Sequence, residues 1–118
     1  MAYGSYESLE VWQRSCRLTV KLYDLLRECK DFGLKDQMTR ASISIASNIA
    51  EGAERDSNAE FIRFLHIAKG SAAELRTQIY IAHDIGIISI AKKEELVKEV
   101  ISISKMLHAL INAVKLKG

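Results

Sequence analysis

The chain has no proline among its 118 residues and only six glycines. Proline is the strongest helix breaker, so a chain without it can form long uninterrupted helices. Long hydrophobic runs are also missing, because charged residues interrupt every apolar stretch, and no segment is predicted to span a membrane. Residues 1–5 have neither the basic region nor the apolar run of a signal peptide, so we expect none.

Groups that usually carry chemistry are scarce. Cys16 and Cys29 lie too far apart along one predicted helix to bridge each other, and we expect reduced thiols in a cytoplasmic protein. His66, His83 and His108 do not form the Glu-x-x-His pattern of di-iron bundles. Neither a phosphate-binding glycine loop nor a nucleophile elbow is present. We therefore expect no metal, no cofactor and no enzymatic activity.

Helical periodicity dominates what the sequence does contain. Hydrophobic residues make up 48% of the chain and charged residues 27%, which is typical of one folded domain over residues 1–118. Apolar residues recur every three or four positions in four segments separated by short breaks. The sequence therefore predicts an all-α fold, an antiparallel up-down-up-down four-helix bundle.

Local signals indicate where these helices begin and end. The first is predicted over residues 8–29 and the second over residues 34–51, with Gly52 as its terminator. Ser57 and Glu60 fit a capping box at the start of the third helix, and Gly86 ends it. The fourth helix is expected to begin after a Ser89 cap.

The first helix is apolar over more of its circumference than one core requires. Its predicted core stripe is Leu9, Trp12, Cys16, Val20, Tyr23 and Leu26. A second stripe beside it contains Val11, Leu18, Leu22, Leu25 and Cys29. The fourth helix has a heptad seam of Leu96, Val100, Ile103, Leu107, Leu110 and Val114. The surplus apolar surface on the first helix predicts contact with another copy of the chain.

Polar residues form one stripe on the second helix, beside its apolar face: Gln37, Arg40, Ser44, Asn48 and Glu51. Ser71 and Glu74 lie one turn apart on the third helix, and an antiparallel pairing would bring the two sets together. Two interpretations stay open. The stripe is either a recognition surface or an internal hydrogen-bond network that fixes helix register.

The net charge of +2 is a mild basic excess. Clustered cations would bind a phosphate backbone by releasing counterions. The predicted nucleic-acid contacts are Arg14, Arg17, Lys21, Arg55, Lys92, Lys93, Lys115 and Lys117. Acidic residues are interleaved with most of them, so the alternative is an ordinary solvated face.

Several spaced motifs resemble the family of 23S rRNA intervening-sequence proteins. The clearest is the segment Ser-Ile-Ala-Ser-Asn-Ile-Ala-Glu-Gly at residues 44–52. Similar elements occur in order at residues 9–13, 32–40, 61–75 and 106–111. The family often has proline before the Phe-Gly-Leu element and at the position of Ala46, and this chain has none there.

The resemblance implies a ribosomal-protein-like four-helix bundle whose copies form a ring, a homopentamer. It also implies similarity to the accessory variability protein of diversity-generating retroelements, a pentameric bundle linked to nucleic acid. No catalytic residues come with the family. We therefore expect a non-enzymatic homo-oligomer that binds RNA or DNA through a basic surface of the ring. The alternative is a protein-interaction or structural scaffold module without a nucleic-acid role.

Overall fold

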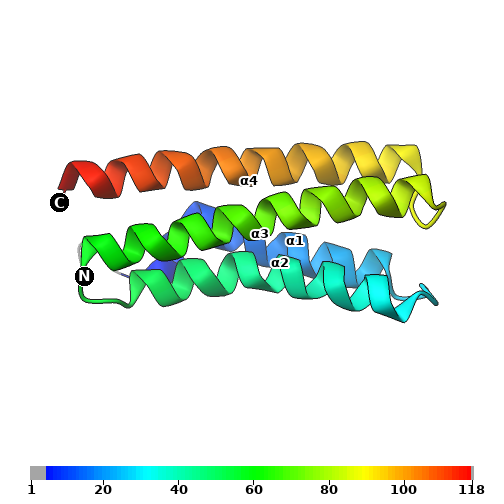
Figure 1. Cartoon of the computed structure of the whole chain (residues 1–118), viewed down its shortest axis with the longest axis horizontal. Coiled ribbons are helices and arrows are strands. Elements are labelled where there is room, and N and C mark those ends of the chain that lie inside the picture. The colour runs from blue at the N-terminus through cyan, green and yellow to red at the C-terminus, as the bar shows by residue number, and fades with distance from the viewer. Residues whose placement is uncertain (1–4, 118) are drawn as a thin grey trace.

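Four α-helices follow one another in the computed structural model, which describes residues 5–117. They are α1 (Glu10–Leu25), α2 (Phe32–Ala53), α3 (Asn58–Asp84) and α4 (Ile90–Lys117), preceded by a short 3-10 helix, η1 (Tyr6–Ser8). Each helix runs antiparallel to the one before it, in a bundle of 46 × 20 × 20 Å (Figure 1). The predicted up-down-up-down four-helix bundle is confirmed.

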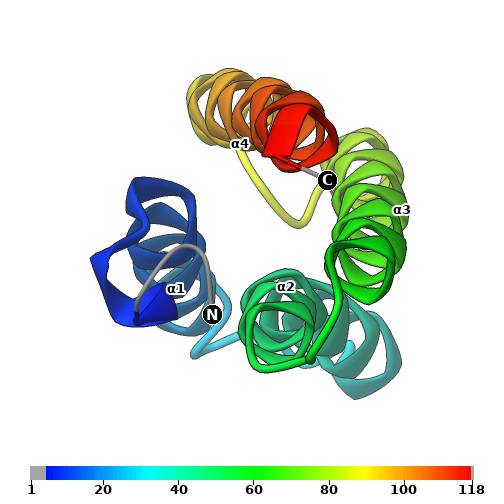
Figure 2. The same cartoon turned by 90° about the vertical axis from the view of Figure 1, so that its left-hand side faces the viewer.

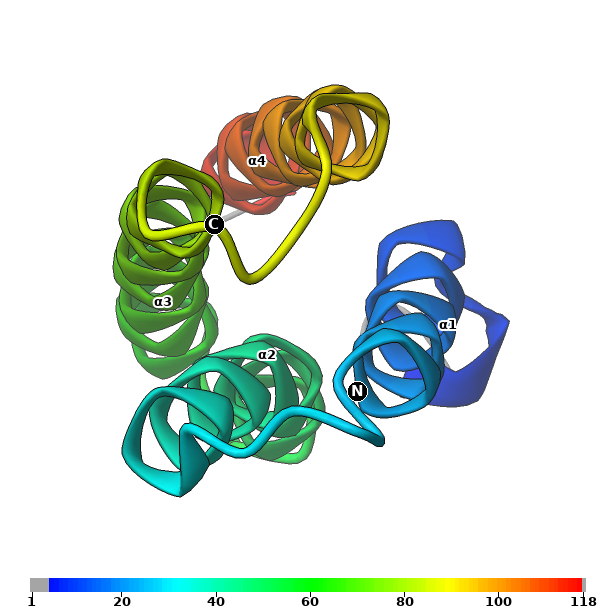
Figure 3. The same cartoon turned by 90° about the vertical axis from the view of Figure 1, so that its right-hand side faces the viewer.

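The four helices surround one hydrophobic core (Figures 2 and 3). Each packs against its neighbours in sequence, and α4 returns to α1. Of these four pairs, α1 and α4 make the least backbone contact. Every helix within residues 5–117 is too short or too polar to cross a lipid bilayer. Residues 1–4, part of the segment without a predicted signal peptide, lie outside the described residues.

Three predicted helix ends are confirmed. Ser57 Oγ accepts a hydrogen bond from the Glu60 amide at 3.1 Å, although the Glu60 carboxylate binds Arg63 and does not complete the capping box. Ser89 Oγ accepts from the Lys92 amide at 3.2 Å. Gly86 has a φ of 85°, the left-handed conformation that glycine adopts without strain, and it follows the last turn of α3.

Two other ends were predicted wrongly. Helix α1 stops at Leu25, and the amide of Leu26 bonds back to the Leu22 and Asp24 carbonyls, so Cys29 lies outside the helix. Gly52 does not terminate α2, which continues to Ala53. It is buried inside the helix because α3 crosses α2 closely at this point.

The predicted core stripe of the first helix was also wrong. The buried residues of α1 are Val11, Ser15, Leu18 and Leu22, with Leu26 just beyond its end. Ser15 occupies a core position because its hydroxyl donates to the Val11 carbonyl at 2.7 Å. Of the expected core stripe, Leu26 is buried, Leu9, Trp12 and Cys16 are half-buried, and Val20 and Tyr23 are exposed at 63% and 45%. In α4 the seam shifts by one residue near its end, where Ile111 is buried and Leu110 is half-buried.

Candidate interaction surfaces

The middle of the polar stripe joins α2 to α3. Ser44 Oγ lies 2.9 Å from Ser71 Oγ, and Asn48 Nδ2 donates to the Ser44 carbonyl at 2.8 Å and to Ser44 Oγ at 2.9 Å. Ser71 is buried, and Ser44 and Asn48 are half-buried. These hydrogen bonds fix one register of the two helices, which is the internal network that the sequence left open.

The rest of the stripe faces solvent. Gln37, Arg40, Glu51 and Glu74 are all exposed, and Arg40 Nε pairs with Asp36 Oδ2 at 2.9 Å within α2. The centre of the polar stripe is therefore an internal contact between α2 and α3, and its ends are ordinary polar surface.

The cations predicted on the first helix are engaged mainly with α4. Arg14 binds the Glu99 carboxylate through Nε and Nη2, at 3.1 and 2.5 Å. This hydrogen bond, opposed in part by burial, raises the pKa of Arg14 above its ordinary value. Lys21 Nζ lies 2.7 Å from Glu95 Oε1, and Lys92 reaches the other oxygen of Glu95 at 3.4 Å. Arg17 and Lys21 are both exposed beside this seam, and of the two only Lys21 makes an ion pair within 4 Å in residues 5–117.

The remaining predicted cations are scattered. The guanidinium of Arg55 stacks on the Phe64 ring at 4.8 Å, while Lys115 and Lys117 are exposed at the end of α4. Figure 1 shows the α2–α3 connection, which contains Arg55, at the same end of the bundle as the C-terminal end of α4. Lys93 Nζ lies 5.1 Å from the Tyr80 ring centroid on the α3–α4 side. The structure therefore does not collect the eight residues into one basic patch.

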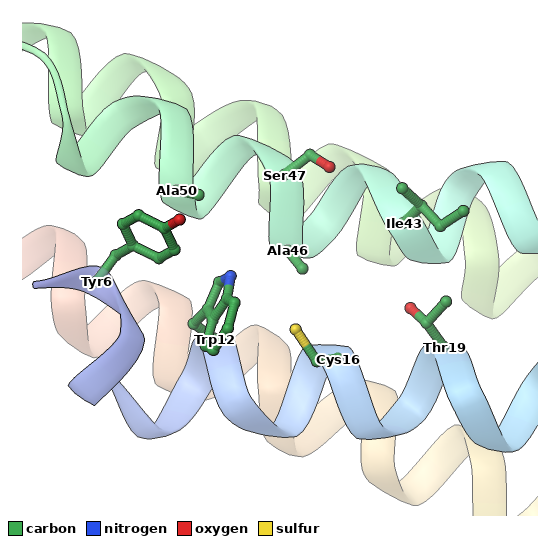
Figure 4. Close-up of a pocket in the computed structure, with 8 residues that line it drawn as sticks. All are labelled: Tyr6, Trp12, Cys16, Thr19, Ile43, Ala46, Ser47 and Ala50. Atoms are coloured by element: carbon green, nitrogen blue, oxygen red, sulfur yellow. The ribbon is translucent and has the colours of Figure 1, made fainter.

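An exposed apolar surface lies between α1 and α2 (Figure 4). It is a hollow of about 360 Å³ lined by Tyr6, Trp12, Cys16, Thr19, Ile43, Ala46, Ser47 and Ala50. We call this the α1–α2 apolar face, together with the adjoining Val20 and Tyr23. The Tyr6 and Trp12 rings pack edge to face at 5.3 Å and form one end of it. Val20, Tyr23 and Ile43 are 63%, 45% and 42% exposed.

The model of the family described as 23S rRNA-intervening sequence protein matches residues 7–109 of this chain. The chain belongs to this family. A crystal structure from Bacteroides thetaiotaomicron VPI-5482, described as a protein of unknown function from the S23 ribosomal protein family, is 28% identical. It superposes with a TM-score of 0.80 over 86% of this chain and 97% of its own. No curated protein sequence matches.

The 23S rRNA-intervening sequence motif at residues 44–52 now has a structural explanation. Ser44 and Asn48 make the polar contact to α3, and Ile45 and Ile49 are buried in the core. Gly52 leaves room for the α3 aromatics, because a β-carbon there would lie 2.6 Å from the β-carbon of Phe64. The motif therefore encodes the α2–α3 packing.

Sequence reasoning missed the polar roles of two buried residues, Ser42 and Gln78. Thr19 Oγ1 lies 2.7 Å from Ser42 Oγ and links α1 to α2. Gln78 is 6% exposed, and nothing in residues 5–117 hydrogen-bonds its Oε1. Neither position interrupts a helical pattern, so the only available signal was a polar residue at core spacing.

The predicted lack of a metal site stays a prediction. Among residues 5–117, no group of three His, Cys, Asp or Glu side chains could hold an ion. Both cysteines are free thiols, and burial raises the pKa of Cys16 against the opposing charge of Arg17. Asp84 Oδ1 lies 3.2 Å from Nδ1 of the neighbouring His83.

Proposed function

We propose that this chain is a non-enzymatic assembly subunit that forms a homo-oligomer in the cytoplasm, a pentamer as the family resemblance implies. The α1–α2 apolar face supports this proposal. Fully burying one large aliphatic side chain is worth about 1.5–3 kcal/mol. Ile43 lines this hollow, Tyr23 shares a neighbouring hollow with Ile43, and Val20 lies one turn after Cys16 on α1. All three are exposed, so contact with another protein surface would recover part of that energy.

The mass of the protein in solution tests self-assembly. Light scattering at micromolar concentration should give a multiple of the 13.2 kDa chain mass. The double variant Val20→Glu with Ile43→Glu places two charges on the exposed face and should shift the mass toward that of one chain. Glu94→Lys, an exposed change on α4, serves as the control. A wild-type chain that remains monomeric would refute the proposal.

RNA or DNA binding is a second proposed function. The description of the family names 23S rRNA. Two basic side chains on the α3–α4 side also support a nucleic-acid ligand. Arg76 and Lys93 both lie over the Tyr80 ring, at 6.0 and 5.1 Å from its centroid. Repetition of such weak cationic sites in an oligomer would increase binding through avidity. The alternative remains a scaffold that contacts only protein.

Charge reversal separates these surfaces. We expect salt-dependent binding of structured RNA or duplex DNA, measured by fluorescence anisotropy. Arg76→Glu with Lys93→Glu should weaken it and reduce the salt slope. Arg17→Glu should have less effect, and Arg14 and Lys21 are poor phosphate ligands because Glu99 and Glu95 already hold them. Absence of binding at low salt would leave the scaffold function alone.

A further inference from the structure

Self-assembly through the α1–α2 apolar face requires a receiving surface on the second copy. This inference rests on the assembly function proposed above. The receiving surface should be partly apolar, should lie outside the α1–α2 apolar face, and should allow close approach. One part of α3 has all three properties.

Five residues form a line on the solvent side of α3: Ile67, Gly70, Glu74, Thr77 and Ile81. Their spacing of three, four, three and four places them on one side of the helix. All five are exposed, and the two isoleucines are 41% and 46% exposed. We call this line the α3 outer strip.

Gly70 is the unusual member of the strip. It lies near the middle of a 27-residue helix, where glycine is less favourable than alanine. A β-carbon at this position would meet nothing within 4 Å in the described chain. Gly52 differs, because Phe64 occupies the space that its side chain would need. Contacts within the chain therefore explain Gly52 and leave Gly70 without a reason.

We propose that the α1–α2 apolar face of one copy docks on the α3 outer strip of the next copy. The hollow has a floor of small residues, including Ala46 and Ala50, which gives room to projecting side chains such as Ile67 and Ile81. Gly70 between these isoleucines lets the rim of the hollow approach the α3 backbone.

Charge agrees with this pairing. None of the eight residues that line the hollow is charged. The single charged residue of the strip is Glu74, and Arg17 borders the face next to Val20. The contact would thus bury few charges: Glu74 in the middle of the strip is the one carboxylate, and Arg17 on the border of the face is the cation that could pair with it.

The two surfaces are not equivalent, and this determines the type of assembly. Helices α1 and α3 lie diagonally across the bundle from each other (Figure 2). Each copy therefore offers one face and one strip, and the contact runs head to tail. Such contacts do not stop at a dimer, and they add copies until a ring closes.

Two assembly-defective variants test the proposal. The face variant carries Val20→Glu and Ile43→Glu, and the strip variant carries Gly70→Gln. Glutamine favours helix more than glycine does, and it enters open space, so the strip variant should fold. Ala109→Gln adds the same side chain to exposed α4 and is the matched control. Ile81→Gln provides a second strip variant, and circular dichroism verifies the helix content of each.

Light scattering then distinguishes the outcomes. Each defective variant alone should have the mass of one chain, whereas Ala109→Gln should assemble as wild type does. An equal mixture of face and strip variants retains one intact contact, so it should form a dimer of twice 13.2 kDa and no larger species. Wild-type assembly by both strip variants, or a mixture that stays monomeric, would overturn the proposal. In either case an oligomeric wild type would leave the assembly function standing.

Discussion

Gly52 in α2 packs directly against Phe64 in α3, so that a β-carbon at position 52 would lie 2.6 Å from that of Phe64. Phe61 is almost as close, with its ring carbon at 3.1 Å and its carbonyl oxygen at 3.2 Å. The nearest atoms belong to the base of a side chain and to backbone, which cannot move aside without moving α3. This contact brings the two helices together next to the loop that connects them.

Gly52→Ala should therefore destabilise the fold although alanine favours helix. Overpacking of this kind costs about 1–3 kcal/mol, more than the roughly 1 kcal/mol that alanine gains in helix propensity. Urea unfolding measures the difference. Gly33→Ala is the control, because its β-carbon would meet only Asp31 Oδ1 at an ordinary 3.7 Å. Equal stabilisation by both changes would contradict the close contact.

The Ser44–Ser71 hydrogen bond should show as a coupling between the two residues. Ser44→Ala and Ser71→Ala should each lower the free energy of unfolding by about 1 kcal/mol, because each leaves a polar partner unsatisfied. The double variant should lose less than the sum, with a coupling of about 0.5–1 kcal/mol. Ser8→Ala removes an exposed hydroxyl that bonds only the nearby Ser5 carbonyl, so it should change little. Additive losses would show that the hydroxyls act independently.

Buried Gln78 offers a stabilising substitution. Its Oε1 has no hydrogen-bond donor within residues 5–117, and such an orphaned acceptor costs about 1–3 kcal/mol. Methionine has a similar shape and no such acceptor, so Gln78→Met should raise the free energy of unfolding by about 1 kcal/mol. Denaturation in urea checks this, and Ala109→Met at an exposed position of α4 is the control. A loss of stability from Gln78→Met would mean that the Gln78 amide makes a stabilising contact.

Acid should weaken the α1–α4 seam. The hydrogen bond and charge of Lys21, followed by Lys92, lower the pKa of Glu95 below its ordinary value of 4.5. A carboxyl with a lowered folded-state pKa stabilises the fold above its unfolded-state pKa and loses that contribution as the pH falls through the folded-state value. The Tm should therefore decrease as the pH is lowered below about 4.5, and Glu95→Gln should make the Tm less dependent on pH.

Glu94→Gln is the matched control for that pH series. It removes the same charge from the neighbouring position. Within residues 5–117, Glu94 has no cationic partner within 4 Å, whereas Glu95 has Lys21 and Lys92. The two variants should therefore differ in their Tm profiles between neutral and acid pH. Identical profiles would show that the Lys21–Glu95 pair does not contribute to the seam. Added salt should reduce the difference because both side chains are exposed.

The order and type of the helices could be predicted from sequence because their cues are local. Ser57, Gly86 and Ser89 act on backbone within a few residues of themselves. In each of α2 and α3 one apolar stripe stands out in the sequence, and its central residues, such as Ile45 and Leu75, are buried.

The face of α1 could not be predicted in the same way. Both of its stripes are apolar enough to form a core, and the true core stripe includes Ser15, which a hydrophobic pattern rejects. Only tertiary packing shows that the Ser15 hydroxyl can be buried against its own helix backbone. Without α2 and α4 in place, the stripe with Trp12 and Val20 looked equally suitable.

The candidate interaction residues depended on distant partners that the sequence does not reveal. Arg14 and Lys21 looked like a basic line on one helix, but Glu99 and Glu95 lie 85 and 74 residues further along the chain. The apolar surplus on the first helix could be recognised without such a partner, but its two stripes were assigned the wrong way round. Leu18 and Leu22 of the second stripe are buried, and Val20 of the expected core stripe is exposed.

The sparse seam between α1 and α4 has a consequence for the route of folding. In this topology three of the four helix pairings join segments that are consecutive in the chain, so they close short loops and should form rapidly. The pairing of α1 with α4 instead requires the two ends of the chain to meet, with the Arg14–Glu99 and Lys21–Glu95 contacts among its links. We therefore expect the consecutive pairs to form first and the α1–α4 seam to close last.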